Sequence, residues 1–390
     1  MHKLSLPVPG DDALAASTTL QQLIIDDIRR QQGWIPFSRY MELALYAPDL
    51  GYYSGGATKL GKDGDFTTAP EMSPLFGATL ARTASQLLRQ TVPQVMEFGA
   101  GTGRLAYDFL SECTFSGITL DRYFIVELSG ELRARQEELL KDFPQVSWLD
   151  AMPASFSGLV LGNEVLDAMP VDLVIKTTEG WREIGVAVVE DEAGPRLLYR
   201  EQTGVDCNPD KIAQIPQHED LPVGYMTEVH AVASAFMHSL ASMLQAGPQA
   251  GAAILIDYGF PAAEYYHPQR LQGSLMCHYR HHAHPDPFYL PGLQDITAHV
   301  DFTAMARAAL LGGLELLAYT SQASFLMSAG IADLLARTSA EQVMHYLPQA
   351  NALQKLVSPA EMGELFKVLI VGKQLDLPED LLRLDRSHRL

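Results

Sequence analysis

The chain has 390 residues, of which 47% are hydrophobic and 19% charged, so it can bury the cores of about two or three domains, and wholesale disorder is excluded. Its 28 Lys and Arg residues against 47 Asp and Glu residues give a formal net charge of −19. Proteins that grip nucleic acid need clustered basic residues, and no run of five occurs here. The charge balance therefore argues against broad binding to nucleic acid or anionic membranes, although a local basic pocket stays open.

The cysteines and the apolar runs indicate the compartment. Cys113, Cys207 and Cys277 are scattered and form no CxxC pair, which favours a reducing environment over a disulfide framework or a zinc site. The first ten residues carry no apolar run, and the longest apolar stretches are far shorter than the ~20 residues of a membrane-spanning helix. We expect a soluble cytoplasmic protein without a membrane partner.

The N-terminal part is predicted to begin with a loose arm and to continue with helices. Residues 1–19 are small and polar, and apolar residues recur at helical spacing over Leu20–Arg30. Ser38 is a candidate cap for a second helix. A third helix is predicted over residues 75–88, after a turn-rich stretch at residues 46–74.

The next hundred residues alternate short apolar runs with helical patterns. Strands that alternate with helices imply βαβ units and a parallel sheet with both faces covered. Helices are predicted from Arg104 and from Ser129. The predicted strands are Val95–Phe98, Tyr123–Val126, Val146–Leu149 and Leu159–Leu161.

After Pro170 this alternation stops, and three runs predict an inserted β-meander. An amphipathic helix over Thr227–Gln245 then leads to the buried strand Ala252–Asp257, which resumes the sheet. A long irregular stretch follows at residues 260–300, and loops of that length inside a domain are usually functional or disordered. The meander runs are Val171–Thr177, Trp181–Glu190 and Arg196–Arg200, and the strands Leu314–Tyr319 and Phe366–Val371 would complete the sheet.

A glycine-rich loop is the most informative motif. An apolar strand ends in an acid, three alternating glycines follow, and a helix begins at once, in the segment Val95-Met-Glu-Phe-Gly99-Ala-Gly101-Thr-Gly103-Arg104. Glycines there let the backbone turn tightly and approach a ligand closely. The dinucleotide fingerprint GxGxxG would need glycine where Arg104 stands, which weakens that interpretation. The E-x-G-x-G-x-G form resembles the first motif of class I S-adenosylmethionine (SAM) methyltransferases, and a plain tight turn is the structural alternative.

Acids end three successive predicted strands. In the methyltransferases that the loop resembles, the strand-end acid, here Glu97, helps to hold the cofactor's ammonium. Glu127, with Leu128 beside it, ends the second strand and could accept both ribose hydroxyls. Asp150 could accept the adenine amino group, or it could cap a helix. Buried unpaired carboxylates are costly, so three acids at one sheet edge favour a SAM site.

Four further segments resemble the MidA-like family of class I SAM-dependent methyltransferases. The matches run in the family's order from about residue 20 to residue 372, and the last segment is the most distinctive. These segments are Gly64-Asp-Phe-Thr-Thr-Ala-Pro-Glu71, Leu161-Gly-Asn-Glu-Val-Leu-Asp-Ala-Met-Pro-Val171, Ile256-Asp-Tyr-Gly259 and Pro291-Gly-Leu-Gln-Asp-Ile-Thr-Ala-His-Val-Asp-Phe302.

The resemblance implies an α/β, Rossmann-like methyltransferase fold. We expect a seven-stranded, mostly parallel sheet, an N-terminal helical region and an inserted subdomain of β-meander and helix. The expected segments are 1–90 (helical region and cofactor-covering loop), 91–170 (first part of the core), 171–222 (acceptor-side insertion), 223–259 (core continued), 260–312 (second insertion) and 313–390 (core completion and tail).

The resemblance also implies an acceptor class. A mitochondrial member of the family symmetrically dimethylates an arginine of a complex I subunit, so we expect a protein acceptor such as a respiratory-complex subunit. The acidic charge balance agrees with a cationic acceptor. A small-molecule methyltransferase and a non-catalytic, SAM-binding assembly chaperone stay as alternatives. The sequence leaves open whether the chain forms a homodimer.

Carboxylates after the fourth strand are candidates for the acceptor site. A guanidinium is protonated at neutral pH and is best held bidentately by carboxylates. Glu164 and Asp167 lie three residues apart, so one helical turn would aim both at the same cleft, while a capped helix start with solvated acids is the alternative. Asn163 could reach the cofactor from the same loop.

Other polar residues have weaker patterns. Asp295 and His299, with Asp301, fit either a general base or acceptor clamp, or a network that pins a long loop. Thr68 lies before a helix and could fold over the cofactor, or could belong to a plain turn. The histidines between residues 278 and 284 lack a metal-binding spacing, so we expect a polar loop and no metal.

Overall fold

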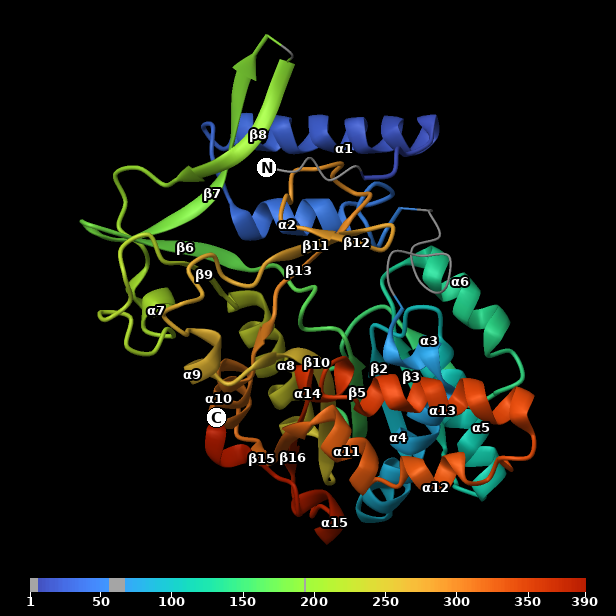
Figure 1. The fold of residues 1–390 in the computed structure, drawn as a ribbon. Helices are drawn as coiled ribbons and strands as arrows, with labels where there is room; N and C mark the ends of the chain where they lie inside the picture. The colour runs from blue at the N-terminus through green and yellow to red at the C-terminus, as the bar shows by residue number, and fades with distance from the viewer. Residues whose placement is uncertain (1–5, 56–66, 193) are drawn as a thin grey trace. The chain divides into compact units, whose positions relative to one another are not determined.

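The computed structural model describes residues 6–55, 67–192 and 194–390 (Figure 1). The chain divides into two units. The described residues of unit 1 are 6–55, 167–192, 194–233 and 262–299, and those of unit 2 are 67–166, 234–261 and 300–390. Residues 67–90 thus belong with the glycine loop, although the sequence pattern grouped them with the N-terminal region. The two inserted segments end at residues 233 and 299, whereas the sequence pattern predicted that they end at residues 222 and 312.

Unit 2 is built on a sheet in the order β15-β16-β10-β5-β2-β3-β4, with β14 beside β10. The five strands from β10 to β4 are parallel, and β16 runs antiparallel to both its neighbours. The expected Rossmann-like methyltransferase sheet is therefore confirmed. Its strands are β2 (Gln94–Phe98), β3 (Arg122–Val126), β4 (Val146–Leu149), β5 (Gly158–Asn163), β10 (Gly251–Phe260), β14 (Val300–Asp301), β15 (Glu315–Ser321) and β16 (Phe366–Lys373).

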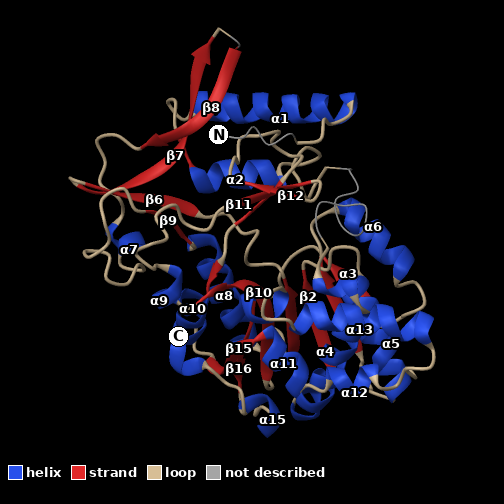
Figure 2. Cartoon of the chain, viewed as in Figure 1, coloured by secondary structure: helices blue, strands red, loops and turns tan. Residues whose placement is uncertain are grey.

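Helices flank the strands of unit 2 on both sides (Figure 2). Phe76 of α4 and Phe109 of α5 join Val95 of β2 and Ile254 of β10 in one buried apolar cluster. Central parallel strands that are covered on both faces consist of continuous apolar runs, and for this reason short apolar runs in the sequence predicted the strands of unit 2. The helices are α3 (Ala69–Met72), α4 (Pro74–Leu87), η1 (Leu88–Gln90), α5 (Arg104–Ser116), α6 (Gly130–Leu139), most of α8 (Ala231–Ala246), α10 (Phe302–Leu311), α11 (Gln322–Ser328), α12 (Ile331–Leu335), α13 (Val343–Val357), α14 (Met362–Leu365), α15 (Glu379–Leu382) and η2 (Ser387–Arg389).

Unit 1 packs two helices against antiparallel strands. Leu20 and Ile24 of α1 and Tyr40 of α2 share a buried cluster with Val186 of β7. One sheet has the order β1-β7-β6-β9 with β8 beside β7, and a second has the order β12-β11-β13. The elements are α1 (Asp11–Arg30), β1 (Ile35–Pro36), α2 (Phe37–Tyr46), β6 (Asp172–Thr177), β7 (Gly180–Asp191), β8 (Gly194–Glu201), α7 (Pro209–Ile212), β9 (Met226–Val229), α9 (Ala262–Tyr265), β11 (Met276–Tyr279), β12 (His282–His284) and β13 (Asp295–Thr297).

Three local predictions were wrong. Helix α1 begins at Asp11 instead of residue 20, and acids in its first turn stabilise that end. Ser38 does not cap α2, because its hydroxyl donates to Asp172 Oδ1 at 2.6 Å. Residues 227–229 form strand β9 on β6 and not the start of a helix, so strand pairing overrides the local periodicity.

Candidate active site

The glycine loop joins β2 to α5 in unit 2 through left-handed backbone. The φ angles of Gly99, Gly101 and Gly103 are +65°, +54° and +85°, a region that side chains other than glycine rarely adopt. A Cβ built on Gly99 would lie 3.0 Å from Val165 Cγ2, and one on Gly103 would lie 3.2 Å from Gln136 Cγ. The torsions therefore favour glycine at all three positions, and the space at Gly99 and Gly103 is tight for a side chain. The loop lies at the carboxyl edge of the sheet, and its glycines leave the backbone accessible to a ligand.

Glu97 of β2 is buried directly before this loop. Its Oε2 accepts a 2.7 Å hydrogen bond from the Tyr123 hydroxyl of β3. Burial raises the pKa of Glu97 to about 7, the bond from Tyr123 opposes that rise, and the nearby charge of Glu127 adds to it. An ammonium group beside this carboxyl would relieve the cost of burying its charge, as the cofactor's amino-acid end would do.

Glu127 follows β3 and accepts hydrogen bonds on both of its oxygens. Its Oε1 accepts from the backbone N–H of Ser129 at 2.8 Å, and its Oε2 accepts from Gln136 Nε2 at 3.0 Å. Burial raises the pKa of Glu127, and the hydrogen bonds from Ser129, Gln136 and Leu128 oppose the shift. A carboxylate has about four lone-pair directions, so acceptor capacity is left for a diol.

The two other residues predicted for the adenosine end are at the surface of unit 2. Leu128 is 82% exposed, which is uncommon for an apolar side chain and leaves it available to a ligand's apolar face. Asp150 lies one residue beyond β4, and its carboxylate, 91% exposed, pairs with Arg133 Nη1 at 2.9 Å. The described structure has no helix between β4 and β5, so Asp150 is not a helix cap, and its contact with adenine stays a prediction.

Gln136 was not predicted, and it connects the whole cofactor side. It is the one buried residue of α6, and it bonds to the glycine loop, to Glu127 and to Trp148 of β4. The sequence indicates Gln136 only weakly. Helix α6 has no apolar stripe, and the residue that it turns toward the sheet is a polar amide. Periodicity of apolar residues does not find such a position.

The segment after β5 is a turn and not a helix. The described structure has no helix between β5 and β6, so the predicted helical turn that would pair Glu164 with Asp167 is wrong. Glu164 has a left-handed φ of +53°, and its Oε1 accepts from Asn163 Nδ2 at 3.0 Å. Asp257 of β10 fixes the turn, because its Oδ2 accepts from the N–H groups of Val165 and Leu166 at 3.1 and 2.9 Å.

These residues of unit 2 fit a bound SAM. The bare loop suits the amino-acid end, Glu97 suits an ammonium and Glu127 suits a diol. The buried Oδ1 of Asn163 has no hydrogen-bond partner among the described residues, which leaves it free for a donor of the ligand. Thr68, half-buried at the start of α3, makes no side-chain cap, while Glu71 of α3 bonds to Thr102 of the loop.

The predicted acceptor acids Asp167 and Asp295 gather with two tyrosines in unit 1. Both oxygens of Asp295 accept from the Tyr53 hydroxyl, at 3.0 and 3.1 Å, and Tyr46 stacks on Tyr53 with ring centroids 5.5 Å apart. Burial raises the pKa of both tyrosines beyond their usual range, and the charges of Asp295 and Asp167 raise it further. We call Tyr46, Tyr53, Asp167 and Asp295 the tyrosine–aspartate cluster.

The remaining candidates are His299 and Asp301. The backbone N–H of His299 donates to Ser274 Oγ at 3.1 Å in unit 1. Asp301 caps α10 by accepting from Ala304 N at 3.1 Å. The first residues of the predicted N-terminal signature, 64–66, lie outside the described residues. Within the described ranges no three His, Cys, Asp or Glu side chains are arranged to hold a metal.

Comparison with known proteins decides the family. A family model described as S-adenosyl-L-methionine-dependent methyltransferase matches residues 75–320, more than half of the chain. The chain belongs to this family. The MidA-like resemblance is thereby confirmed, and the protein is a SAM-dependent methyltransferase.

Relatives of the methyltransferase are similar over most of their length. The chain is 28% identical to "Protein arginine methyltransferase NDUFAF7, mitochondrial" of Xenopus tropicalis, covering 93% of this chain and 87% of the relative. Its counterpart in Mus musculus is 29% identical, with 86% and 80% covered. A superfamily member from Burkholderia thailandensis, solved with S-adenosyl-homocysteine bound, is 52% identical with a TM-score of 0.92, covering 99% of this chain and 100% of that one.

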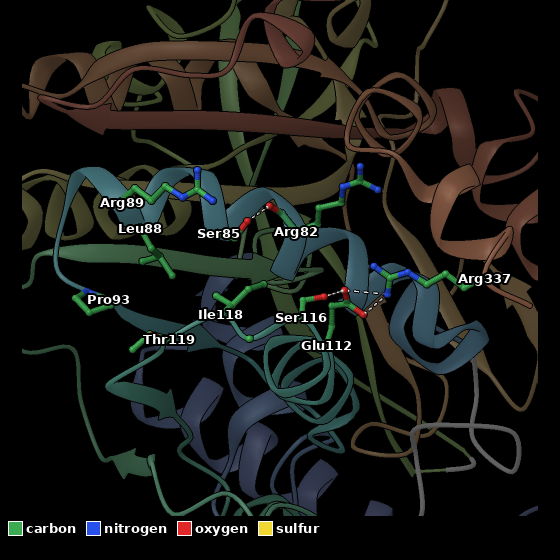
Figure 3. A pocket seen from close by; sticks show the side chains of 11 residues that line it. Arg82, Ser85, Leu88, Arg89, Pro93, Glu112, Ser116, Ile118, Thr119 and Arg337 are labelled. Atoms are coloured by element: carbon green, nitrogen blue, oxygen red, sulfur yellow. Dashed lines mark hydrogen bonds and ion pairs between the residues drawn. The ribbon is translucent and has the colours of Figure 1, made fainter.

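The methyltransferase also has a pocket of about 490 Å³ in unit 2, at the opposite edge of the sheet (Figure 3). Pro93, which precedes β2, and Thr119, which precedes β3, line it. Arg337 Nη1 contacts the two oxygens of Glu112 there at 2.8 and 3.0 Å. Because the glycine loop follows the carboxyl end of β2, this pocket is separate from the candidate cofactor site.

No helix among the described residues is long and apolar enough to cross a membrane.

Proposed function

We propose that this SAM-dependent methyltransferase methylates a guanidinium nitrogen of an arginine in a partner protein. The observation that carries the proposal is the similarity, over 86–93% of the chain, to proteins named protein arginine methyltransferase. The tyrosine–aspartate cluster of unit 1 supports it with chemistry that suits a planar cation.

The cluster would recognise a guanidinium through charge and stacking. Carboxylates bind the guanidinium fork bidentately, and aromatic faces attract it by cation–π interaction. The raised pKa values of Tyr46 and Tyr53 keep both phenols neutral, so Tyr53 donates to Asp295 and holds that carboxylate in one orientation. A preorganised carboxylate loses little entropy on binding the acceptor.

The chain's own residues would bind, orient and deprotonate. When bound, SAM supplies a methyl group on a sulfonium sulfur. The glycine loop, Glu97 and Glu127 would hold the cofactor, and Asp167 and Asp295 would orient the acceptor nitrogen. That nitrogen must lose a proton as its bond to carbon forms, and Glu164 and His299 are the groups that we propose to accept it.

We also propose a cationic protein acceptor, such as a respiratory-complex subunit, and action in the cytoplasm. The acidic net charge supports a cationic partner. All three cysteines are free and buried, which agrees with a reducing compartment. A homodimer is proposed as the assembly to test.

Labelled transfer tests the function. Purified protein is incubated with methyl-labelled SAM and lysate of a strain that lacks its gene, and the lysate is separated into protein and small molecules. We expect label in protein. Label confined to small molecules would make this a small-molecule methyltransferase, and no label despite SAM binding would make it a non-catalytic chaperone.

Asp295→Asn separates recognition from cofactor binding. It keeps the side chain's shape and removes its charge, so we expect label transfer to fall about 10²-fold, the scale of losing a positioned catalytic group. Affinity for S-adenosyl-homocysteine should not change. Asp49→Asn, the same change at an exposed site of unit 1, is the matched control. Full activity of Asp295→Asn would remove the cluster from the acceptor site.

A further inference from the structure

The side chain of Gln136 is completely buried, whereas every other residue of its helix, α6, is at least partly exposed. It is the one buried residue of α6, with a sequence of Gly-Glu-Leu-Arg-Ala-Arg-Gln-Glu-Glu-Leu. Burying an amide costs free energy unless its donors and acceptor are bonded. An apolar residue would pack α6 on the sheet at lower cost, so the amide needs a reason beyond packing.

Three hydrogen bonds supply that reason. Gln136 Nε2 donates to the carbonyl oxygen of Gly101 at 2.8 Å and to Glu127 Oε2 at 3.0 Å. Its Oε1 accepts from Trp148 Nε1 at 2.9 Å. One amide thus joins the middle of the glycine loop, the acid that follows β3 and strand β4.

Trp148 determines which way this amide faces. An indole N–H can only donate, so the amide oxygen must face Trp148. The amino group is then directed at Gly101 and Glu127, which both present oxygen atoms. With the amide reversed, its oxygen would face two acceptors and its amino group would face a donor.

The hydrogen bond from Gln136 Nε2 also fixes the orientation of the Glu127 carboxylate. Ser129 N–H occupies one oxygen and Gln136 the other, so the carboxylate plane is fixed from two directions. The carboxylate keeps acceptor capacity for the hydroxyls of a ribose. Gln136 also packs under the loop, since a Cβ on Gly103 would lie 3.2 Å from its Cγ.

We propose that Gln136, oriented by Trp148, is a positioning residue of the cofactor site: it holds Glu127 and the glycine loop in the arrangement that binds SAM. The inference rests on Glu127 as the ribose ligand. Gln136 touches neither the cofactor nor the acceptor in this account, and it acts through the two groups that it bonds.

A double-mutant cycle tests the proposal on the full-length protein, with S-adenosyl-homocysteine as the calorimetric ligand. Gln136→Met keeps the length of the side chain and removes its donor and acceptor, so we expect about tenfold weaker binding, the scale of one lost hydrogen bond to a charged group. Glu127→Gln should weaken binding by at least as much. If Gln136 acts through Glu127, the double variant should lose clearly less than the product of the two factors.

Trp148→Phe provides a second, milder variant. It removes the donor that orients the amide, so we expect a loss of binding smaller than that of Gln136→Met, and no additional loss when the two are combined. Glu138→Gln, at an exposed position of the same helix, should bind like the wild type.

Three outcomes would overturn the inference. The first is unchanged S-adenosyl-homocysteine affinity in Gln136→Met. The second is an affinity loss in the double variant that equals the product of the two single losses, because a residue that only packs would act independently of Glu127. The third is unchanged affinity in Glu127→Gln, which would remove the ribose ligand itself. None of these outcomes touches the proposed arginine acceptor, which the label distribution tests separately.

Discussion

Glu97, buried in β2, and Glu127, half-buried directly after β3, have different surroundings, and this gives the two acids different expected roles. Glu97 has one phenolic donor and a pKa raised to about 7, so its charge is incompletely compensated. Glu127 has a backbone and an amide donor on separate oxygens, so it is held as an oriented acceptor. The first environment suits a cationic ligand group, and the second suits hydroxyls.

Glu127→Ala should weaken S-adenosyl-homocysteine binding about 10- to 150-fold, since hydrogen bonds to a charged acceptor contribute roughly 1.5–3 kcal/mol. The free energy of unfolding of the ligand-free protein should change little. Calorimetry and urea denaturation measure the two quantities. A large loss of stability with little loss of affinity would make Glu127 structural.

The raised pKa of Glu97 predicts a pH dependence of stability. Between the ordinary value of 4.5 and about 7, the folded ligand-free protein binds a proton at Glu97 that the unfolded chain releases. The contribution of Glu97 to stability is therefore present at low pH and is lost as pH rises through that interval. Urea denaturation should show a smaller decline from pH 5 to pH 8 in Glu97→Gln than in the wild type. Equal declines would contradict this assignment.

At the scale of elements, the turn after β5 is positioned by its neighbour β10. Asp257 accepts from Val165 and Leu166 through one oxygen and from Tyr258 N–H at 2.9 Å through the other. The two donors from the turn, on one buried carboxylate, fix the segment that follows Asn163 and carries Glu164. The turn needs this support because Glu164 adopts a left-handed φ.

Asp257→Asn should destabilise the protein by about 1–3 kcal/mol, because an amide cannot accept at both positions and leaves a buried N–H unpaired. We expect label transfer to fall by more than the change in S-adenosyl-homocysteine affinity. Denaturation, calorimetry and the transfer assay report the three quantities. Wild-type stability would show that the turn does not depend on Asp257.

Gly101→Val tests the loop between β2 and α5. The φ of +54° makes any side chain costly by ~1–2 kcal/mol, and a branched one would also fill the space of the cofactor's amino-acid end. We expect S-adenosyl-homocysteine binding to be abolished. Gly117→Val is the matched control, because Gly117 has a φ of +64° and open space at its Cβ, so it should lose stability and keep its affinity. Calorimetry with retained affinity in Gly101→Val would reject the cofactor site.

At the scale of the whole molecule, the sequence predicted unit 2 well because its determinants are local. The strands β2, β3 and β5 are short apolar runs, and the glycine loop and its acids directly follow them. The meander β6–β8 was also predicted, from three successive runs of residues after Pro170. A parallel sheet brings such strand ends to one edge, so chain order alone placed these side chains.

The features that the sequence did not reveal depend on contacts between distant segments. Gln136 is buried because of where α6 packs, and Asp257 fixes a turn about 90 residues earlier through backbone N–H groups that carry no sequence signal. The tyrosine partner of Asp295 lies 242 residues away, at Tyr53. Residues 227–229 became strand β9 because β6 supplies its pairing edge.

Amino-acid analysis of the labelled product tests directly whether arginine is the methylated residue. Protein labelled by the purified methyltransferase and methyl-labelled SAM in deletion-strain lysate is hydrolysed in acid, and its methylated amino acids are separated. The account predicts that the label elutes as methylated arginine, and that Glu164→Gln, with S-adenosyl-homocysteine affinity retained, yields far less of it. Label in methyl-lysine or in another residue, with none in arginine, would contradict the account.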